Sequence, residues 1–281
     1  CSIAGNDACS LAGMMQRFKA VVSYDGFDYA GWQIQPAERG ATIQQTIQDA
    51  ISVICQQPVS ITGSGRTDAQ VHAWGQVFHF DVDFSLNAFQ WKRAINGHLP
   101  KDIHIRSVEA VDSRFHARFD AIGKRYEYRI QLGEANVFTR RYAFQSPWTL
   151  NVQAMREGAA YLIGEHDFSS FCANSRAEMP DQARTITRLE LAEENDQLRL
   201  IYEGSGFLRY MVRMMTGTLI EVGRGRLAPQ DVQWMLQAQD KQICHFNAKP
   251  QGLTLVEVYY PAAAAEAPAD DSALNRKQKE K

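Results

Sequence analysis

Hydrophobic and polar positions follow two regular spacings along the first half of the chain. Phe78, Phe80 and Val82 alternate with polar neighbours, which is typical of a strand with one buried face. Isoleucines recur at helical spacing from Ile43 onward, so an amphipathic helix is expected over residues 43–56. Further expected elements are strands at 18–23, 59–62 and 103–111 and a helix at 87–97. The order strand–helix–strand–strand–helix–strand predicts a split βαβ, ferredoxin-like unit.

The second half repeats this outline. Tyr126, Tyr128 and Ile130 alternate with charged residues and predict a strand, and Asn151 is placed to cap the helix that follows. Apolar residues from Leu208 onward recur on one face of a second helix. Further expected elements are strands at 184–193, 197–204 and 253–259 and a helix from Pro229 to about residue 238. Two α+β halves of similar order, joined near residues 112–122, predict a pseudo-duplicated architecture.

The two ends of the chain differ from the part between them. Residues 1–16 lack the basic start and long apolar run of a secretory signal, and we expect a disordered leader. Residues 261–281 contain almost no large apolar side chain, which predicts a disordered tail. The expected domains are an N-terminal α+β half, 17–115, and a C-terminal α+β half, 116–260. No run approaches the roughly 18 apolar residues that span a bilayer, so no membrane partner is expected.

Composition and net charge exclude few classes of protein. The 281 residues are 45% hydrophobic, enough for a sizeable core, and the net charge of −2 does not by itself indicate a nucleic-acid binder. A nucleic-acid site would need locally concentrated positive charge, and a basic cluster that could follow phosphates does occur, although solvated surface is the alternative. Its members are Arg114, His116, Arg118, Lys124, Arg125, Arg129, Arg140, Arg141, Arg224 and Arg226.

The five cysteines are scattered and include no CxxC pair. Their spacing suits neither a zinc site nor a disulfide framework, and it is typical of a protein in a reducing cytoplasm. His72 follows Asp68 by four residues, but no further ligands stand at close spacing, so no metal is expected and His72 is interpreted as packing under its loop.

The most informative segment is a glycine-rich turn that leads into a strand. Residues 63–72 read Gly-Ser-Gly-Arg-Thr-Asp-Ala-Gln-Val-His, which places Arg66 two residues from Asp68. Glycine allows the backbone to approach a ligand closely. A carboxylate beside a fixed cation can stay ionised and act as nucleophile or base. Taken alone, Asp68 could equally be a structural residue that caps the turn.

Residues 65–80 resemble the catalytic loop of the tRNA pseudouridine synthase A family, through Gly-Arg-Thr-Asp-Ala-x-Val-His followed by Gly-Gln-Val-x-x-Phe. Three later segments are also similar to family motifs: Lys-Arg-Tyr-Glu-Tyr-Arg at 124–129, the stretch 204–217, and Lys-Pro-Gln-Gly-Leu-Thr-Leu at 249–255. The resemblance covers about residues 17–260. The family usually has glycine where Gln70 stands.

The resemblance implies a role for each of five residues. It makes Asp68 the essential carboxylate, Arg66 a contact to RNA phosphate or part of the machinery that turns the target base out, and Tyr126 a residue that stacks on the flipped uracil. It makes Arg213 the ion-pair partner of Asp68, while Arg209 lies four residues earlier on the same helix edge. Leu253 would pack against the uracil. From the residues alone, Tyr126 and Leu253 could be core and Arg213 an exposed helix arginine, and Tyr128 is interpreted as core.

The resemblance also implies fold, activity and partners. The fold is α+β, with two ferredoxin-like halves whose antiparallel sheets flank a central basic cleft (the pseudouridine synthase fold). The activity is isomerisation of uridine to pseudouridine at positions 38, 39 and 40 of the tRNA anticodon stem-loop, without cofactor or metal. The enzyme would be a homodimer with one tRNA across both subunits. The stretch His166 to Phe171 would shape the rim of the cleft.

Two functions of other classes remain as alternatives. A non-catalytic RNA-binding or RNA-chaperone protein could use the same scaffold. A hydrolase could use Asp68 with a second carboxylate, although no second acid stands in a comparable glycine-rich loop.

Overall fold

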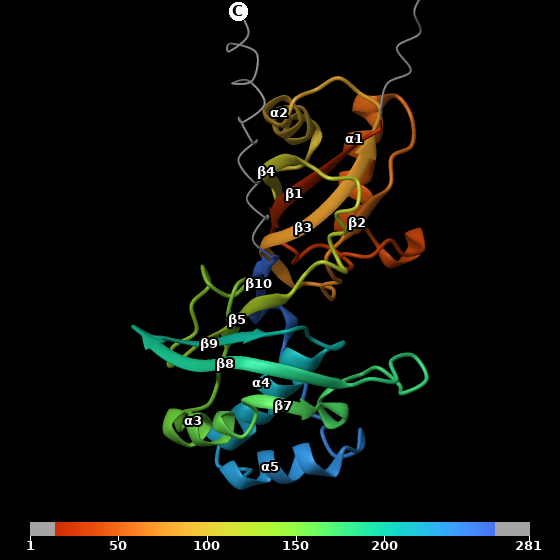
Figure 1. Cartoon of the computed structure of the whole chain (residues 1–281). Coiled ribbons are helices and arrows are strands. Elements are labelled where there is room, and N and C mark those ends of the chain that lie inside the picture. Colours follow the sequence, from red (N-terminus) through yellow and green to blue (C-terminus); the bar gives the residue numbers. More distant parts are fainter. Residues whose placement is uncertain (1–14, 262–281) are drawn as a thin grey trace, which may run out of the picture.

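The computed structural model describes residues 15–261 and contains one mixed sheet with helices packed beside it (Figure 1). The strand order is β4-β1-β3-β10-β5-β9-β8-β7, with β2 beside β3 and β6 beside β5. The strands are β1 (Gln16–Tyr24), β2 (Ile61–Gly63), β3 (His72–Val82), β4 (Ile103–Val111), β5 (Gly123–Gln131), β6 (Phe144–Gln145), β7 (Gly164–Asp167), β8 (Ala183–Glu194), β9 (Gln197–Gly204) and β10 (Leu253–Tyr259). The α-helices are α1 (Ile43–Cys55), α2 (Ala88–His98), α3 (Val152–Ala160), α4 (Met211–Gly223) and α5 (Pro229–Ala238). The fold is therefore α+β, as expected.

The first half contains β1 to β4 with α1 and α2. Its strands are antiparallel neighbours in the order β4-β1-β3-β2. Thr42 begins α1 because its side chain accepts a hydrogen bond from the Gln45 backbone N–H, and the buried isoleucines of α1 face the sheet side of the core. The Gln45 side chain donates to Asp49 at 2.6 Å, so Thr42 and Gln45 do not form a reciprocal capping box. Asn87 and Gln90 form a reciprocal box at the start of α2.

The second half repeats the strand order with different elements. Its strands lie in the order β10-β5-β9-β8, and the short strand β7 extends this edge. Helices α3, α4 and α5 pack together on the side of the molecule away from the first half (Figure 1). The sequence patterns did not reveal β6 and β7, because two and four residues are too few to show an alternation.

The strands of both halves form one sheet rather than the two that were expected. Strand β2 pairs only with Phe78–Phe80 of the eleven-residue strand β3. The start of β3 is therefore free on that side, and β10 pairs with it in parallel, with Thr254 opposite His72 and Leu255 opposite Ala73. The unequal lengths of β2 and β3 thus allow the second half to continue the sheet of the first.

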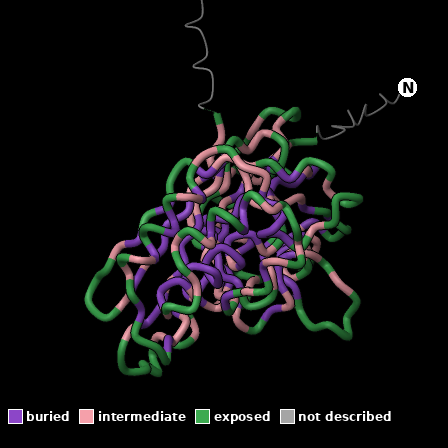
Figure 2. Tube along the Cα trace, turned by 90° about the horizontal axis from the view of Figure 1, so that it is seen from below, coloured by how far each residue is buried: buried purple, intermediate pink, exposed green. Residues whose placement is uncertain are grey.

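The core runs through both halves without a break. Buried segments occupy the centre of the chain trace and exposed ones its outer loops (Figure 2). The largest fully buried side chains come from both halves and include Trp91, Phe78, Tyr128 and Tyr202. The hydroxyl of Tyr128 donates to the Lys249 carbonyl at 2.8 Å, which agrees with its interpretation as a core residue.

Two sequence expectations concern residues at the margins of the described region. The expected leader (1–16) and tail (261–281) lie almost entirely outside the described residues. Within residues 15–261, no helix combines the length and the apolar character needed to cross a membrane. The three cysteines in this range, Cys55, Cys172 and Cys244, are free thiols.

The junction of the two halves gives a first testable prediction. A Cβ added at Gly75 of β3 would lie 2.4 Å from the Val256 carbonyl oxygen of β10. We expect Gly75→Ala to lower the free energy of unfolding by about 1–3 kcal/mol, because backbone must move to remove the clash. Urea unfolding followed by circular dichroism measures this change.

Gly97→Ala is the matched control. Gly97 lies in α2 with open space around its Cα, so alanine should raise the free energy of unfolding by about 0.5–1 kcal/mol through its higher helix propensity. Equal effects of the two substitutions would contradict the importance of the close approach between β3 and β10.

Candidate active site

The glycine-rich segment forms a rigid loop between β2 and β3. The Ser64 backbone N–H donates to the Val77 carbonyl at 2.7 Å, and the Ser64 hydroxyl donates to the Gln76 side-chain carbonyl at 2.6 Å. The Gln76 amide then donates to the Gly65 carbonyl at 3.0 Å. Gln76 is fully buried, so this side chain replaces water as the hydrogen-bond partner of the loop.

A second set of contacts holds the loop just before Asp68. The Trp32 N–H donates to the Thr67 carbonyl at 3.0 Å, and the Thr67 hydroxyl lies 2.8 Å from the Tyr24 hydroxyl. Gly31 has φ +101°, and a Cβ there would lie 2.7 Å from the Thr67 carbonyl oxygen. The tight approach of residues 31–32 therefore requires glycine and fixes the backbone next to the carboxylate.

Asp68 forms an ion pair with Arg213, which lies in the first turn of α4. The Arg213 Nη1 donates to the Asp68 Oδ2 at 3.0 Å, and the Arg213 Nε donates to the Ala248 carbonyl at 2.9 Å. The Asp68 side chain is 26% exposed and the Arg213 side chain is 11% exposed, so the pair is partly desolvated. The structure thus brings together two residues that are 145 positions apart in sequence.

The electrostatic surroundings of Asp68 act in opposite directions. Burial raises the pKa of Asp68, whereas the hydrogen bond and charge of Arg213, and the charge of Arg209, lower it. The effect of burial is larger, so the pKa lies above its ordinary value. Asp68 is therefore a more basic carboxylate than a surface aspartate, held in one orientation and still partly accessible to a ligand.

Asp68 lies on the wall of a cavity of about 1360 Å³ to which both halves contribute. Tyr126 of β5 and Leu253 of β10 are buried and line this cavity beside the loop. The Tyr126 ring meets Phe207 edge to face at 5.2 Å between centroids. Arg66 also lines the cavity, where it is exposed and its Nε donates to Gln33 at 3.1 Å.

Arg209 lines the same cavity but does not lie on α4, as the helical spacing had predicted. Tyr210 adopts the left-handed conformation (φ +62°) and precedes the helix, which begins at Met211. Arg209 and Arg213 nevertheless both place a guanidinium over the Tyr210 ring, at 5.1 and 5.0 Å from its centroid. The Tyr210 ring thus contacts two cations near Asp68.

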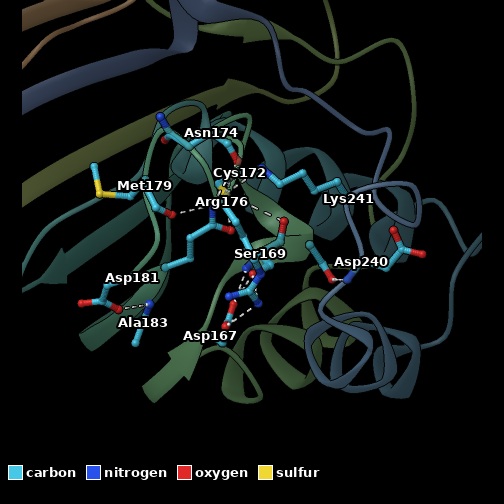
Figure 3. A network of polar contacts seen from close by, with 12 residues as sticks. Asp167, Ser169, Cys172, Asn174, Arg176, Met179, Asp181, Ala183, Asp240 and Lys241 are labelled. Atoms are coloured by element: carbon cyan, nitrogen blue, oxygen red, sulfur yellow. Dashed lines mark hydrogen bonds and ion pairs between the residues drawn. The ribbon is translucent and has the colours of Figure 1, made fainter.

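The backbone of Arg209 is fixed by a loop that sequence reasoning missed. The Arg209 N–H donates to the Asn174 side chain at 2.9 Å, and the Arg209 carbonyl accepts from Ala173 at 2.9 Å. Asn174 belongs to the polar network of Figure 3, in which the buried Gln182 side chain donates to the Asn174 carbonyl at 3.1 Å. An isolated loop asparagine carries no sequence signal for such a contact.

The stretch His166 to Phe171 was expected to shape the rim of the RNA cleft, but none of its residues lines the Asp68 cavity. Phe168 and Phe171 are fully buried, and Asp167 bonds Ser169 and, at 3.0 Å, Arg176 (Figure 3). The rim is instead formed by the residues that follow, including Asn174, Glu178 and Met179. The turn Ser169–Phe171 instead contacts α4 and α5, which places its aromatic residue in the core.

His72 packs beneath its loop, as interpreted from the sequence. The Gly26 N–H donates to His72 Nδ1 at 3.1 Å, and His72 Nε2 donates to the Arg141 carbonyl at 2.8 Å. Burial lowers the pKa of His72, and the nearby Asp25 opposes this effect.

Among residues 15–261, no group of three or more potential metal ligands occurs. Gln70, where the family usually has glycine, has φ +66°, the left-handed region that favours glycine.

Most of the predicted basic cluster is neutralised by carboxylates. Arg125 and Arg129 contact Glu127, Arg141 contacts Asp25 and Asp28, and Arg114 contacts Asp112. Arg224 and Arg226 both contact Glu221. Two members, Arg118 and Lys124, line the Asp68 cavity and form no ion pair within residues 15–261. Of these partners, only Asp25 and Asp28 lie far away in sequence from the arginine they contact, and the spacing of charges could not reveal them.

Comparisons with known proteins agree with the motifs. The family model described as tRNA pseudouridine synthase matches residues 20–120 and 159–261. The "tRNA pseudouridine synthase A" of Exiguobacterium sibiricum is 45% identical over 247 residues, which cover 88% of this chain and 98% of that protein. The protein of the same name from Bacillus subtilis is 43% identical, with coverages of 87% and 99%. A solved Cbf5–Nop10–Gar1 complex matches with a TM-score of 0.34 and 10% identity, too low to support an argument.

The ion pair gives a prediction about protonation. We expect Arg213→Gln to raise the pKa of Asp68 further, because burial then acts with less opposing positive charge. At a given pH above the wild-type value, the ionised fraction of Asp68 should fall. Titration of ¹³C-labelled aspartate carboxyls by NMR measures the shift directly.

Arg156→Gln is the control for this titration. It removes one positive charge from a different ion pair, with Glu193, and should leave the Asp68 titration unchanged. An Asp68 pKa that stays constant or falls in Arg213→Gln would show that the pair does not control the charge of the carboxylate.

Proposed function

The chain belongs to the tRNA pseudouridine synthase family, whose members are isomerases of tRNA uridines, and we propose that it acts at positions 38, 39 and 40 of the anticodon stem-loop with Asp68 as the catalytic carboxylate. The observation that carries the assignment of Asp68 is its ion pair with Arg213 on the wall of a large cavity.

The reaction needs one positioned carboxylate and no redox change. The N1–C1′ bond of the uridine breaks, the base turns, C5 bonds to C1′, and the proton lost from C5 balances the one gained at N1. A carboxylate could attack C1′, add at C6 of the ring, or abstract the 2′ proton, and each route needs Asp68 ionised. Arg213 supports that charge at 3.0 Å. No cofactor or metal takes part in this proposal.

The other cavity residues take roles that fit their placement. The target base must leave its stack to reach Asp68. Tyr126 and Leu253 would contact the extruded uracil, because both are buried and line the cavity close to the loop. Arg66 and Arg209 are exposed cations at the same cavity and would contact the phosphates or the extruded base.

The finer architecture belongs to the same proposal. We take residues 17–115 and 116–260 as two ferredoxin-like halves, because their strand orders β4-β1-β3-β2 and β10-β5-β9-β8 correspond. The Asp68 cavity between them is the proposed tRNA cleft. A homodimer in the cytoplasm would give one tRNA a longer basic surface than a single chain with net charge −2.

Substitution of Asp68 tests the catalytic assignment. We expect Asp68→Ala to reduce tritium release from C5-labelled uridine in tRNA by at least about a thousandfold, because the essential carboxylate is lost. The dissociation constant for tRNA should change little. A non-catalytic RNA-binding protein would show no tritium release in wild type either, and a hydrolase would release free base instead of pseudouridine.

Substitution of Tyr126 separates stacking from proton transfer. Burial raises the pKa of Tyr126 far above its ordinary value, so the side chain is a neutral phenol at neutral pH. We expect Tyr126→Phe to lower turnover about tenfold or more with unchanged tRNA affinity, since it keeps the ring and loses the hydroxyl. Single-turnover kinetics measures this. Wild-type turnover in Tyr126→Phe would leave the residue a stacking role only.

A further inference from the structure

Two members of the basic cluster that line the Asp68 cavity are left without a carboxylate partner within residues 15–261. Most members of the basic cluster pair with acids, but Lys124 and Arg118 form no ion pair within residues 15–261, and both line the cavity. Lys124 lies on β5 two residues before Tyr126, so the two side chains project from the same face of the strand. Lys124 therefore belongs to the site by position.

Lys124 contacts the catalytic loop directly. Its ammonium donates to the Ser64 carbonyl at 2.9 Å, and a Cβ added at Gly65 would lie 2.5 Å from the same nitrogen. The absence of a side chain at residue 65 is what allows the ammonium to sit against the loop. An ammonium has three N–H donors, and within the described residues Ser64 accepts one of them.

Arg118 is the second cation. It lies on the segment between β4 and β5, is exposed, and has its guanidinium 5.8 Å from the Phe119 ring centroid. Burial lowers the pKa of Lys124 to about 8, and the positive charge of Arg118 adds to this effect. Both side chains line the same cavity, and two like charges there disfavour each other. A bound anion between them would remove this repulsion and restore charge balance.

We propose that Lys124 and Arg118 form a phosphate subsite that binds a phosphodiester flanking the extruded uridine. This inference rests on the proposed function, and it adds a ligand group and two residues to it. A lysine binds phosphate as a compact point charge, and an arginine on the other side supplies further donors.

The distance from the reacting carboxylate agrees with such a contact. Ser64 and Asp68 are four residues apart, which corresponds to at most roughly 14 Å of extended chain. The Lys124 ammonium thus lies within about one or two nucleotides of a base held at Asp68. Extrusion of that base turns its own backbone toward the enzyme, so a phosphate next to the target is the anion best placed to reach the subsite.

A purely structural role for Lys124 is the competing explanation. The bond to Ser64 could serve only to hold the loop, as Gln76 does from the other side. A structural lysine would affect turnover but would make no difference to how the enzyme responds to the charge of one phosphate. That response is therefore the quantity to measure.

The experiment uses full-length tRNA assembled by ligation, with a neutral methylphosphonate at either phosphate that flanks the target uridine. Dissociation constants are measured for wild type, Lys124→Met, Arg118→Gln and the control Lys101→Met, an exposed lysine that does not line the cavity. At one of the two phosphates we expect the neutral linkage to weaken wild-type binding about tenfold. Lys124→Met should bind unmodified tRNA about tenfold more weakly and be insensitive to that same linkage.

Salt dependence provides an independent measurement. Loss of one phosphate contact should reduce the slope of log affinity against log salt by about 0.7–0.9 in Lys124→Met and in Arg118→Gln. Lys124→Arg should keep the wild-type slope because it keeps the charge. Arg118 is exposed, so its substitution tests the subsite even where Lys124→Met fails to fold.

Two results would overturn the subsite. One is an equal methylphosphonate effect in wild type and Lys124→Met, and the other is an unchanged salt slope in both variants. Either result, together with normal tritium release by wild type, rejects the phosphate subsite and leaves the proposed function in place. An absence of tritium release from wild type on any tRNA would instead reject the function itself.

Discussion

The ion pair between Asp68 and Arg213 depends on how the two halves of the chain are joined. Asp68 comes from a loop of the first half and Arg213 from a helix of the second. A partly buried carboxylate is costly unless a cation accompanies it. The pair therefore requires that α4 and the β2–β3 loop be held at a fixed separation, and the continuous sheet provides that constraint through the pairing of β3 with β10.

The same junction positions the remaining cavity residues. Leu253 begins β10, and Leu255 of β10 lies opposite Tyr126 of β5, so both cavity strands are registered against β3. The loop with Asp68 ends where β3 begins, at His72. Main-chain hydrogen bonds between the strands thus fix the position of the loop relative to the wall of the cavity. The side chains therefore need only modest adjustment to contact a ligand.

Local sequence patterns were sufficient for most elements but not for the contacts between them. The alternation in β5 and the isoleucine spacing of α1 reflect burial that each element shows by itself. The parallel pairing of β10 with β3 depends on the shortness of β2, which no local pattern expresses. Arg209 was placed on the helix because its spacing to Arg213 is helical. In the structure Tyr210 is left-handed and α4 begins only after it, at Met211. The carboxylates that pair with Arg141 could not be found from local patterns for the same reason, since Asp25 lies 116 residues away in sequence.

An uninterrupted sheet also limits how this molecule can adapt to a partner. Hinge closure needs a connection that can bend at little cost, whereas opening the cavity between the halves here would break hydrogen bonds between β3 and β10. A cavity held by main-chain pairing keeps a fixed shape, so a macromolecule that binds there must supply most of the conformational change itself.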